Sequence, residues 1–176
     1  MSSVAVLFAR SDSVYKRFEL ADVWDIDRDA RGYLGNAPVV AHPPCRAWGR
    51  LRHLAKPRQD ERDLAIFAVD AVRQWGGVLE HPAGSILWQA ARLPAPGRRD
   101  QFGGFTLPIL QSWFGHPAPK STWLYICGVE PSEIPIFPFQ LGIPPGRVEL
   151  MGKAAREKTP FELAAWLLNL ASKAAH

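Results

Sequence analysis

The strongest constraint on the fold is a series of short apolar runs, each followed closely by polar residues or by proline. Runs of this length, rich in Val, Ile and Leu, are typical of buried strands and are too short for most helices. We therefore expect strands at residues 4–9, 21–27, 38–42, 77–81 and 121–129. Pro43 and Pro44 end the third of these runs.

The clearest helix lies between residues 60 and 75, where apolar side chains recur every three or four positions. Acidic residues occupy its first turn, close to the positive end of the helix dipole. The pair Gly76-Gly77 is expected to end it. The apolar positions are Leu64, Phe67, Ala68, Ala71, Val72 and Trp75.

Another helix is expected near the C-terminus, from Thr159 through Leu168. Thr159 is the predicted N-cap, Pro160 suits the first helical turn, and Glu162 would complete a capping box. Near the N-terminus, a short helix is expected, for which Ser11, Asp12 and Ser13 are the candidate caps.

Strands that alternate with helices predict an α/β protein built on a parallel sheet. With 176 residues, the chain has the size of one ordinary domain, and it contains no internal repeat and no linker. We therefore expect a single domain over residues 1–176. The proline-rich residues 130–150 are expected to be irregular.

The location of the protein follows from what the sequence lacks. No apolar stretch reaches the roughly 18 residues of a membrane-spanning helix. The N-terminal residues MSSVAVLFARSD do not have the pattern of a secretory signal. We expect a cytoplasmic protein with no membrane partner. In a reducing cytoplasm Cys45 and Cys127 are not expected to pair, and Cys127 is predicted to be a buried strand residue.

The charge of the chain is mildly positive, with a formal net charge of +4 at pH 7 and a pI near 9.3. This balance alone favours a polyanionic partner only weakly. The positive charge is concentrated between residues 46 and 58, where no acid occurs. Such a segment either contacts phosphates or is a solvated surface. Its basic residues are Arg46, Arg50, Arg52, Lys56 and Arg58.

Polar clusters follow several predicted strands, at residues 10–13, 25–27, 42–45 and 80–81. In open α/β sheets, ligands bind outside the carboxyl ends of the strands, so these clusters are expected to share one crevice. The Pro-Pro step fixes the direction of Cys45, and nearby arginines would favour its nucleophilic thiolate. Glu80 could donate a proton, and Asp25 stands where an acid commonly holds ribose hydroxyls.

Each of these residues also has a purely structural interpretation. A cysteine in a proline-rich loop is more often structural than catalytic, and Glu80 could simply pair with an arginine. Asp25 and Asp27 could be a solvated strand end. A zinc site is only weakly indicated, because the pattern HxxC with scattered histidines is not specific. Its candidate ligands are His42, Cys45, His81 and His116.

The order of these features resembles the DNA cytosine-5 methyltransferases, in particular their short phage and prophage relatives. The segment PPCRAWG resembles the Pro-Cys nucleophile motif, with Cys45 in the nucleophile position. DERDLAIFAVDAVRQWGGVLEHP places Glu80 at the position of the catalytic acid, and VWDIDRDA resembles the cofactor-binding acidic stretch. FGHPAPKSTWLYICG (114–128) and the terminal TPFELA are also similar to the phage relatives.

The resemblance implies a Rossmann-like methyltransferase sheet with flanking helices and no target-recognition domain. It implies S-adenosylmethionine as cofactor, bound by Phe8, Asp25, Ile26 and Pro44. The family chemistry is attack of the Cys45 thiolate on C6 of a flipped cytosine, while Glu80 helps to protonate N3 and C5 takes the methyl group.

The partner implied by this chemistry is DNA or a pyrimidine nucleotide in a bacterial host cell. The basic loop would contact phosphates, and Trp48 could stack in the gap left by the flipped base. The residues expected to bind nucleic acid are Arg46, Trp48, Arg50, Arg52, Lys56 and Lys120. The sequence leaves the oligomeric state open.

The chain departs from the family pattern at its first motif, where LFARSDSVY replaces a Phe-x-Gly-x-Gly turn and contains no glycine. His81 replaces an Asn, and Arg46 a Gln. The alternative hypothesis is therefore a methyltransferase-like protein that has lost cofactor chemistry and binds nucleic acid in phage–host conflict. A structural or regulatory protein without a nucleic-acid role is a further alternative.

Overall fold

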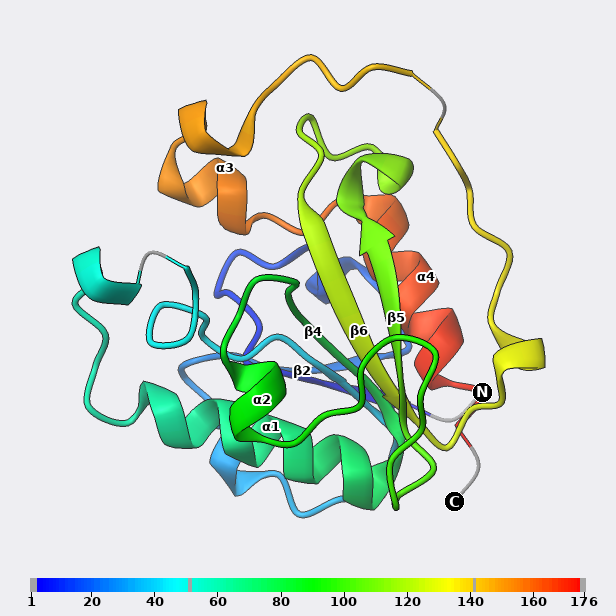
Figure 1. Cartoon of the computed structure of the whole chain (residues 1–176). Helices are drawn as coiled ribbons and strands as arrows, with labels where there is room; N and C mark the ends of the chain where they lie inside the picture. The colour runs from blue at the N-terminus through cyan, green and yellow to red at the C-terminus, as the bar shows by residue number, and fades with distance from the viewer. Residues whose placement is uncertain (1–2, 51, 141, 175–176) are drawn as a thin grey trace.

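The computed structural model contains one mixed sheet with the strand order β2-β1-β3-β4-β6-β5 (Figure 1). It describes residues 3–50, 52–140 and 142–174; Leu51, in the basic loop of the sequence analysis, lies outside this range. The six strands are β1 (Val4–Leu7), β2 (Ala21–Trp24), β3 (Val39–Ala41), β4 (Gly77–Pro82), β5 (Phe105–Leu110) and β6 (Ser121–Cys127).

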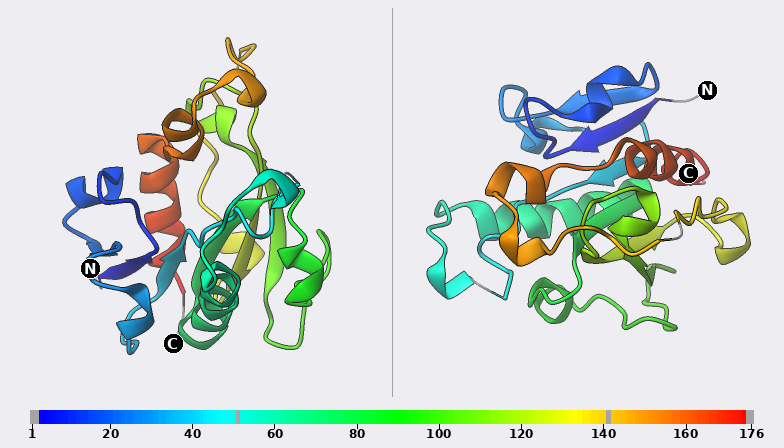
Figure 2. Two further views of the ribbon diagram at one scale, coloured as in Figure 1. Left: turned by 90° about the vertical axis from the view of Figure 1, so that its left-hand side faces the viewer. Right: turned by 90° about the horizontal axis from the view of Figure 1, so that it is seen from above.

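Helices cover both faces of the sheet, so the molecule has three layers. On one face α4 packs against the centre of the sheet, and on the other face α1 and α2 pack together (Figure 2). The short helix α3 lies apart, over the carboxyl ends of the parallel strands (Figure 1). Within the described residues the α-helices are α1 (Glu61–Trp75), α2 (Leu87–Ala90), α3 (Lys153–Glu157) and α4 (Phe161–Ala171).

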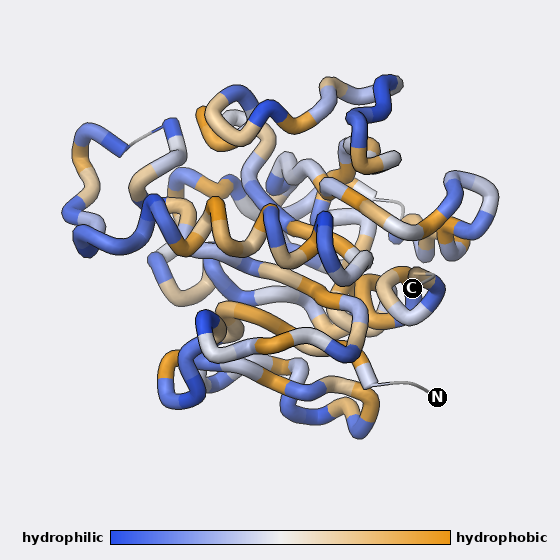
Figure 3. The backbone as a smooth tube through the Cα atoms, turned by 90° about the horizontal axis from the view of Figure 1, so that it is seen from below, coloured by the Kyte–Doolittle hydropathy of each residue, from blue (hydrophilic) through white to orange (hydrophobic). Residues whose placement is uncertain are grey.

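The apolar runs form strands because both faces of the sheet are buried. Successive residues of a strand point to opposite faces, and β1 shows this directly. Val4 and Val6 pack on the side of α4, whereas Ala5 and Leu7 pack on the side of α1. Hydrophobic segments therefore gather in the middle of the molecule, and most of the peripheral loops are hydrophilic (Figure 3).

The expected strands and the α/β class are confirmed, but the sheet is not fully parallel. Strands β1 to β4 pair in parallel, whereas β6 is antiparallel to both β4 and β5. The sequence analysis did not predict the strand at residues 105–110, which contains Pro108, a residue without the N–H that a central strand needs. The strand β5 lies at the edge of the sheet, where proline is tolerated.

The predicted helix 60–75 is confirmed as α1, and Gly76 ends it with a positive φ of 71°. Ser13 caps the short N-terminal helix, a 3₁₀ turn at Val14–Arg17. The capping box predicted at Thr159 is wrong. The N-cap of α4 is Pro160, whose extended backbone enters the helix without a side-chain cap. Residues 130–150 are irregular apart from 3₁₀ turns at Pro131–Glu133 and Val148–Leu150, as expected.

None of the helices in the described parts of the chain combines the length and the apolar character needed to cross a membrane.

Gly77 allows β4 to start directly against β3, and this close approach can be tested. Its φ is +110°, and a Cβ atom there would lie 2.0 Å from the Val39 carbonyl oxygen. Gly97 also has a positive φ, +80°, but no atom lies within 4 Å of its Cβ position. We expect Gly97→Ala to lower the free energy of unfolding by about 1 kcal/mol through backbone strain. Gly77→Ala should lower it by about 1–3 kcal/mol more through overpacking.

Chemical denaturation of the two variants measures this difference. Equal losses at the two positions would contradict the close approach of β4 to Val39.

Candidate functional site

A large groove lies outside the carboxyl ends of the parallel strands. The chain runs from β1 to β2 on one side and then to β3 on the other, so the order reverses between β1 and β3. Ligands of open α/β sheets bind at such a point. The groove has a volume of about 1820 Å³, and all the predicted polar clusters reach it. They contribute Arg10, Asp12, Ser13, Asp25, Ile26, His42, Pro43, Pro44, Cys45, Glu80 and His81.

Glu80, in β4, has the best-defined surroundings in the groove. Its side chain is 12% exposed, and its two oxygens have different partners. The Oε2 atom lies 2.9 Å from His42 Nδ1, and Gln111 Nε2 donates to Oε1 at 2.8 Å. Burial raises the pKa of Glu80, but the hydrogen bond from His42 and the charge of Lys120 lower it more, to about 2. Glu80 is therefore a carboxylate at neutral pH, not the ready proton donor that was expected.

His42, which follows β3, is held from its other side by Tyr15. The Tyr15 hydroxyl lies 2.8 Å from His42 Nε2, and the Tyr15 side chain is buried. Burial and the charge of Glu80 raise the pKa of Tyr15 well above its usual value, so Tyr15 keeps its proton. Tyr15 can then donate to Nε2, which leaves the imidazole proton on Nδ1, facing Glu80.

Gln111 is a site residue that the sequence analysis missed. It follows β5, is 1% exposed, and donates from Nε2 to both Glu80 and Thr122. Its Oε1 atom is buried and finds no hydrogen-bond partner among the described residues. The available signal was a glutamine within an apolar segment, LPILQSWFG, for which no strand was predicted.

Cys45 lines the same groove as Glu80, but its thiol is not activated. Burial, followed by the negative charge of Glu80, raises the pKa of Cys45, and Lys120 opposes this shift only in part. The raised pKa of Cys45 is opposite to the expected activation by neighbouring arginines, and the nearest of them in the sequence, Arg46, pairs with Glu61. In the free protein, Cys45 is therefore mainly a protonated thiol.

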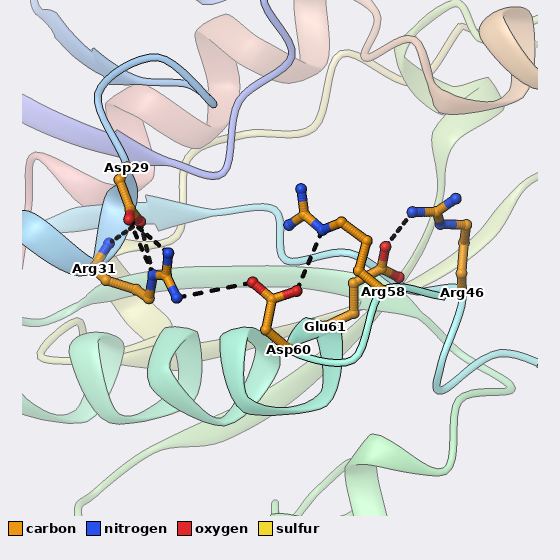
Figure 4. A network of polar contacts seen from close by, with 6 residues as sticks. All are labelled: Asp29, Arg31, Arg46, Arg58, Asp60 and Glu61. Carbon is orange, nitrogen blue, oxygen red and sulfur yellow. Dashed lines mark hydrogen bonds and ion pairs between the residues drawn. The ribbon is translucent and has the colours of Figure 1, made fainter. Parts of the chain in front are cut away.

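The basic loop is tied to the start of α1 by ion pairs. Arg46 binds the buried carboxylate of Glu61, and Arg58 Nε lies 3.2 Å from Asp60 Oδ1 (Figure 4). Asp60 also lies 3.8 Å from Arg31, which binds Asp29 (Figure 4). Part of the positive charge of the loop is therefore neutralised by acids close to it in the fold, which the sequence of the loop did not reveal.

The other predicted nucleic-acid residues have different environments. Arg50 and Arg52 line the groove and make no ion pair within the described residues. Lys56 is exposed but lies outside the groove. Lys120 lines the groove, and its charge lowers the pKa of Glu80.

Trp48 does not fit its predicted role as a stacking platform. The side chain is only 5% exposed and packs in the core on the α1 side of the sheet. The guanidinium of Arg62 lies over its ring, 5.3 Å from the ring centroid. The backbone carbonyl of Trp48 accepts a hydrogen bond from Ser85, which also contacts the buried His81. Burial lowers the pKa of His81 to about 4, so this histidine is neutral.

The predicted cofactor residues all line the groove: Phe8, Asp25, Ile26 and Pro44. Asp25 is 7% exposed; its Oδ2 atom accepts from Lys16 Nζ at 2.7 Å, and its Oδ1 atom accepts from the Asp27 backbone at 3.1 Å. The hydrogen bond from Lys16 is the main cause that lowers the pKa of Asp25. An ionised carboxylate has about four acceptor sites, so Asp25 can still accept hydroxyl groups.

The glycine-free turn after β1 is built around Arg10. The backbone of Phe8 is left-handed there, with a φ of 62°, a conformation that glycine adopts most readily. Arg10 binds both oxygens of Asp12, at 2.8 and 3.2 Å, and reaches Glu157 of α3 at 2.9 Å. An ion-pair network thus occupies the turn that carries glycines in the methyltransferases that the sequence resembles.

Within the described residues, no three His, Cys, Asp or Glu side chains are grouped so that they could hold a metal ion.

No protein-family model matches the chain, and no curated protein and no solved structure matches it either.

The pKa of Cys45 can be tested through its reactivity. Alkylation requires the thiolate, so in the wild type the reaction of Cys45 should accelerate only at a higher pH than that of glutathione. Glu80→Gln removes a negative charge and should shift the pH profile of Cys45 to lower pH. Lys120→Gln removes a positive charge and should shift it to higher pH. Mass spectrometry of the labelled peptides measures both profiles.

Cys127 provides an internal control for this experiment. It is 3% exposed, and burial raises its pKa to about 11, so it should stay unlabelled in the folded protein. If Glu80→Gln left the profile of Cys45 unchanged, the electrostatic coupling between the two residues would be refuted.

Proposed function

We propose that the protein binds a pyrimidine base of DNA in the groove and acts on it as a cytosine-5 methyltransferase, with Cys45 as nucleophile. The observation that carries this proposal is that Cys45, Glu80 and Asp25, from three different strand ends, line one groove at the reversal of strand order. The sheet and its flanking helices support a Rossmann-like fold, in which this position binds nucleosides.

The groove residues fit the nucleoside half of S-adenosylmethionine. Asp25 has free acceptor sites for ribose hydroxyls, and Ile26, which is 70% exposed, offers an apolar surface for an adenine ring. Phe8 and Pro44 would complete this site. When bound, the cofactor would supply the methyl group.

Glu80 and Cys45 would act on opposite edges of the base. His42 and Gln111 hold Glu80 as a carboxylate, which can accept a hydrogen bond from the exocyclic amino group of cytosine. The base covers the carboxylate and strengthens the desolvation that raises its pKa, which favours sharing a proton with ring N3.

In the addition step, one proton leaves the thiol of Cys45 and one proton is added to N3 of the base. The sulfur of Cys45 forms a bond to C6, the C5–C6 double bond opens, and N3 gains a proton while the thiol loses one. C5 then becomes the electron-rich carbon that is methylated. C5 then loses its proton to water, the C6–S bond breaks, and the proton on N3 returns to the sulfur, which restores the ring and the thiol. Because the pKa of Cys45 is raised, the thiol is expected to lose its proton as the sulfur adds to C6.

A second candidate function is a DNA-binding protein of the same fold without methyl transfer. Two observations favour it: the Arg10 network fills the turn after β1, and the thiol of Cys45 is protonated in the free protein. Cofactor binding separates the two candidates, since only the enzyme needs it.

Calorimetry with S-adenosylmethionine and its demethylated product tests the cofactor assignment. The enzyme candidate predicts binding that weakens at least tenfold in Asp25→Ala, because hydrogen bonds to a charged group contribute about 1.5–3 kcal/mol. Asp27→Ala is the matched control, since Asp27 is exposed and lies outside the groove. Equal affinity in the two variants would remove the ribose role of Asp25, and no binding to the wild type would favour the second candidate.

Trapping with 5-fluorocytosine DNA tests the nucleophile. Fluorine replaces the C5 hydrogen that must leave, so the adduct with Cys45 cannot be resolved and should survive denaturing electrophoresis in the presence of cofactor. Cys45→Ser should abolish the adduct, because a hydroxyl is far less nucleophilic at neutral pH. Cys127→Ala should retain it, and Glu80→Gln should reduce it strongly.

If the wild type bound this DNA without forming an adduct, the enzyme candidate would fail and the second candidate would replace it.

A further inference from the structure

We propose that α3 and the basic loop form the two walls of a clamp for single-stranded DNA, and that Lys153 and Arg156 of α3 and Lys158, its C-cap, contribute to the first wall. The proposal rests on the proposed function, since the strand would carry the base that Cys45 and Glu80 bind. No pattern in the sequence predicted α3 or its position near the basic loop.

The two walls line the same groove although they are far apart in the sequence. Lys153 and Arg156 of α3 and the following Lys158 line it on one wall, and Arg50 and Arg52 line it from the loop after β3. Both segments lie at the carboxyl ends of the parallel strands (Figure 1, Figure 2). Cations on two sides of one groove match the spacing of phosphates along a strand that runs through it better than they match a single small anion.

The size of the groove supports an extended ligand. Small-molecule pockets have volumes of about 300–1,000 Å³. The groove, with about 1820 Å³, has room for more than one such ligand. A nucleoside cofactor at Asp25 therefore leaves space for a segment of nucleic acid between the two walls.

The positive charge of α3 is effectively larger than its sequence indicates. Its acid, Glu157, is bound by Arg10 at 2.9 Å, so Glu157 repels a phosphate less than a free carboxylate would. Lys153, Arg156 and Lys158 form no ion pair within the described part of the chain. Two further acids line the groove near α3: Glu149, which precedes the helix, and Asp12, which Arg10 also binds.

An exposed apolar side chain lies among the cations of the basic loop. Leu54 is 72% exposed and lines the groove. Its aliphatic surface can cover the face of an unstacked base, which adds affinity to the phosphate contacts because apolar surface is removed from water.

A single strand fits this groove better than a duplex does. Glu80 is only 12% exposed, so a base must leave any stack to reach it. In a single strand, the base is already unpaired and the cost of unpairing does not arise.

Fluorescence anisotropy with a labelled, cytosine-containing single strand tests the clamp. The test variant is Lys153→Ala/Lys158→Ala, and the control is Arg98→Ala/Lys173→Ala, which removes the same charge from exposed positions outside the groove. Each phosphate contact contributes about 0.7 to the slope of log affinity against log salt for single strands. The test variant should therefore lose about 1.4 from this slope and bind about tenfold more weakly at low salt. The control should keep the slope of the wild type.

The outcomes separate this inference from the proposed function. If the wild type binds the strand and the two double variants have equal slopes, the clamp is refuted while the proposed function stands. If the wild type binds no nucleic acid, both fail. Equal or tighter binding of duplex DNA, or tighter binding of RNA of the same sequence, would overturn the assignment to single-stranded DNA. Melting curves of both double variants check that they remain folded.

Discussion

Hydrogen bonds to the carboxylate of Glu80 connect the strand ends that form the site. They reach from β4 to His42 after β3, onward to Tyr15 after β1, and to Gln111 after β5. A buried carboxylate is costly unless its oxygens are satisfied, and removal of one partner leaves an uncompensated charge. The network therefore favours one relative arrangement of these strand ends over small displacements. The same bonds keep Glu80 ionised, which determines how the neighbouring thiol behaves.

The charges around the groove are arranged in two ways. Close to the sheet, cations and acids are paired, as in Lys16 with Asp25 and Arg46 with Glu61. Farther out, on α3 and in the basic loop, several cations have no carboxylate within ion-pair distance among the described residues. The inner pairs hold the loops in place, and the outer cations are available to an anion. The mild net charge of the chain does not distinguish these two groups.

Local sequence patterns predicted the parts of the structure that local physics decides. The apolar runs became strands, and the period of α1 was recognisable because one face of a single continuous helix is buried.

Partners distant in the sequence decided the rest. Pro108 excludes a central strand but not an edge strand, and only the complete sheet shows which of the two it is. Trp48 stands among arginines in the sequence, yet the fold places it in the core. The pKa of Cys45 depends on burial and on Glu80, which no pattern around residue 45 reveals. Gln111 acquires its role only because β5 ends beside β4.

Pro108 also has a consequence for the behaviour of the protein at high concentration. An edge strand offers unpaired backbone groups to any other strand, and this is a common route to polymerisation. In the edge strand β5, the exposed Pro108 has no N–H to donate to an added strand. A single proline thus hinders the growth of this sheet into a larger, intermolecular one.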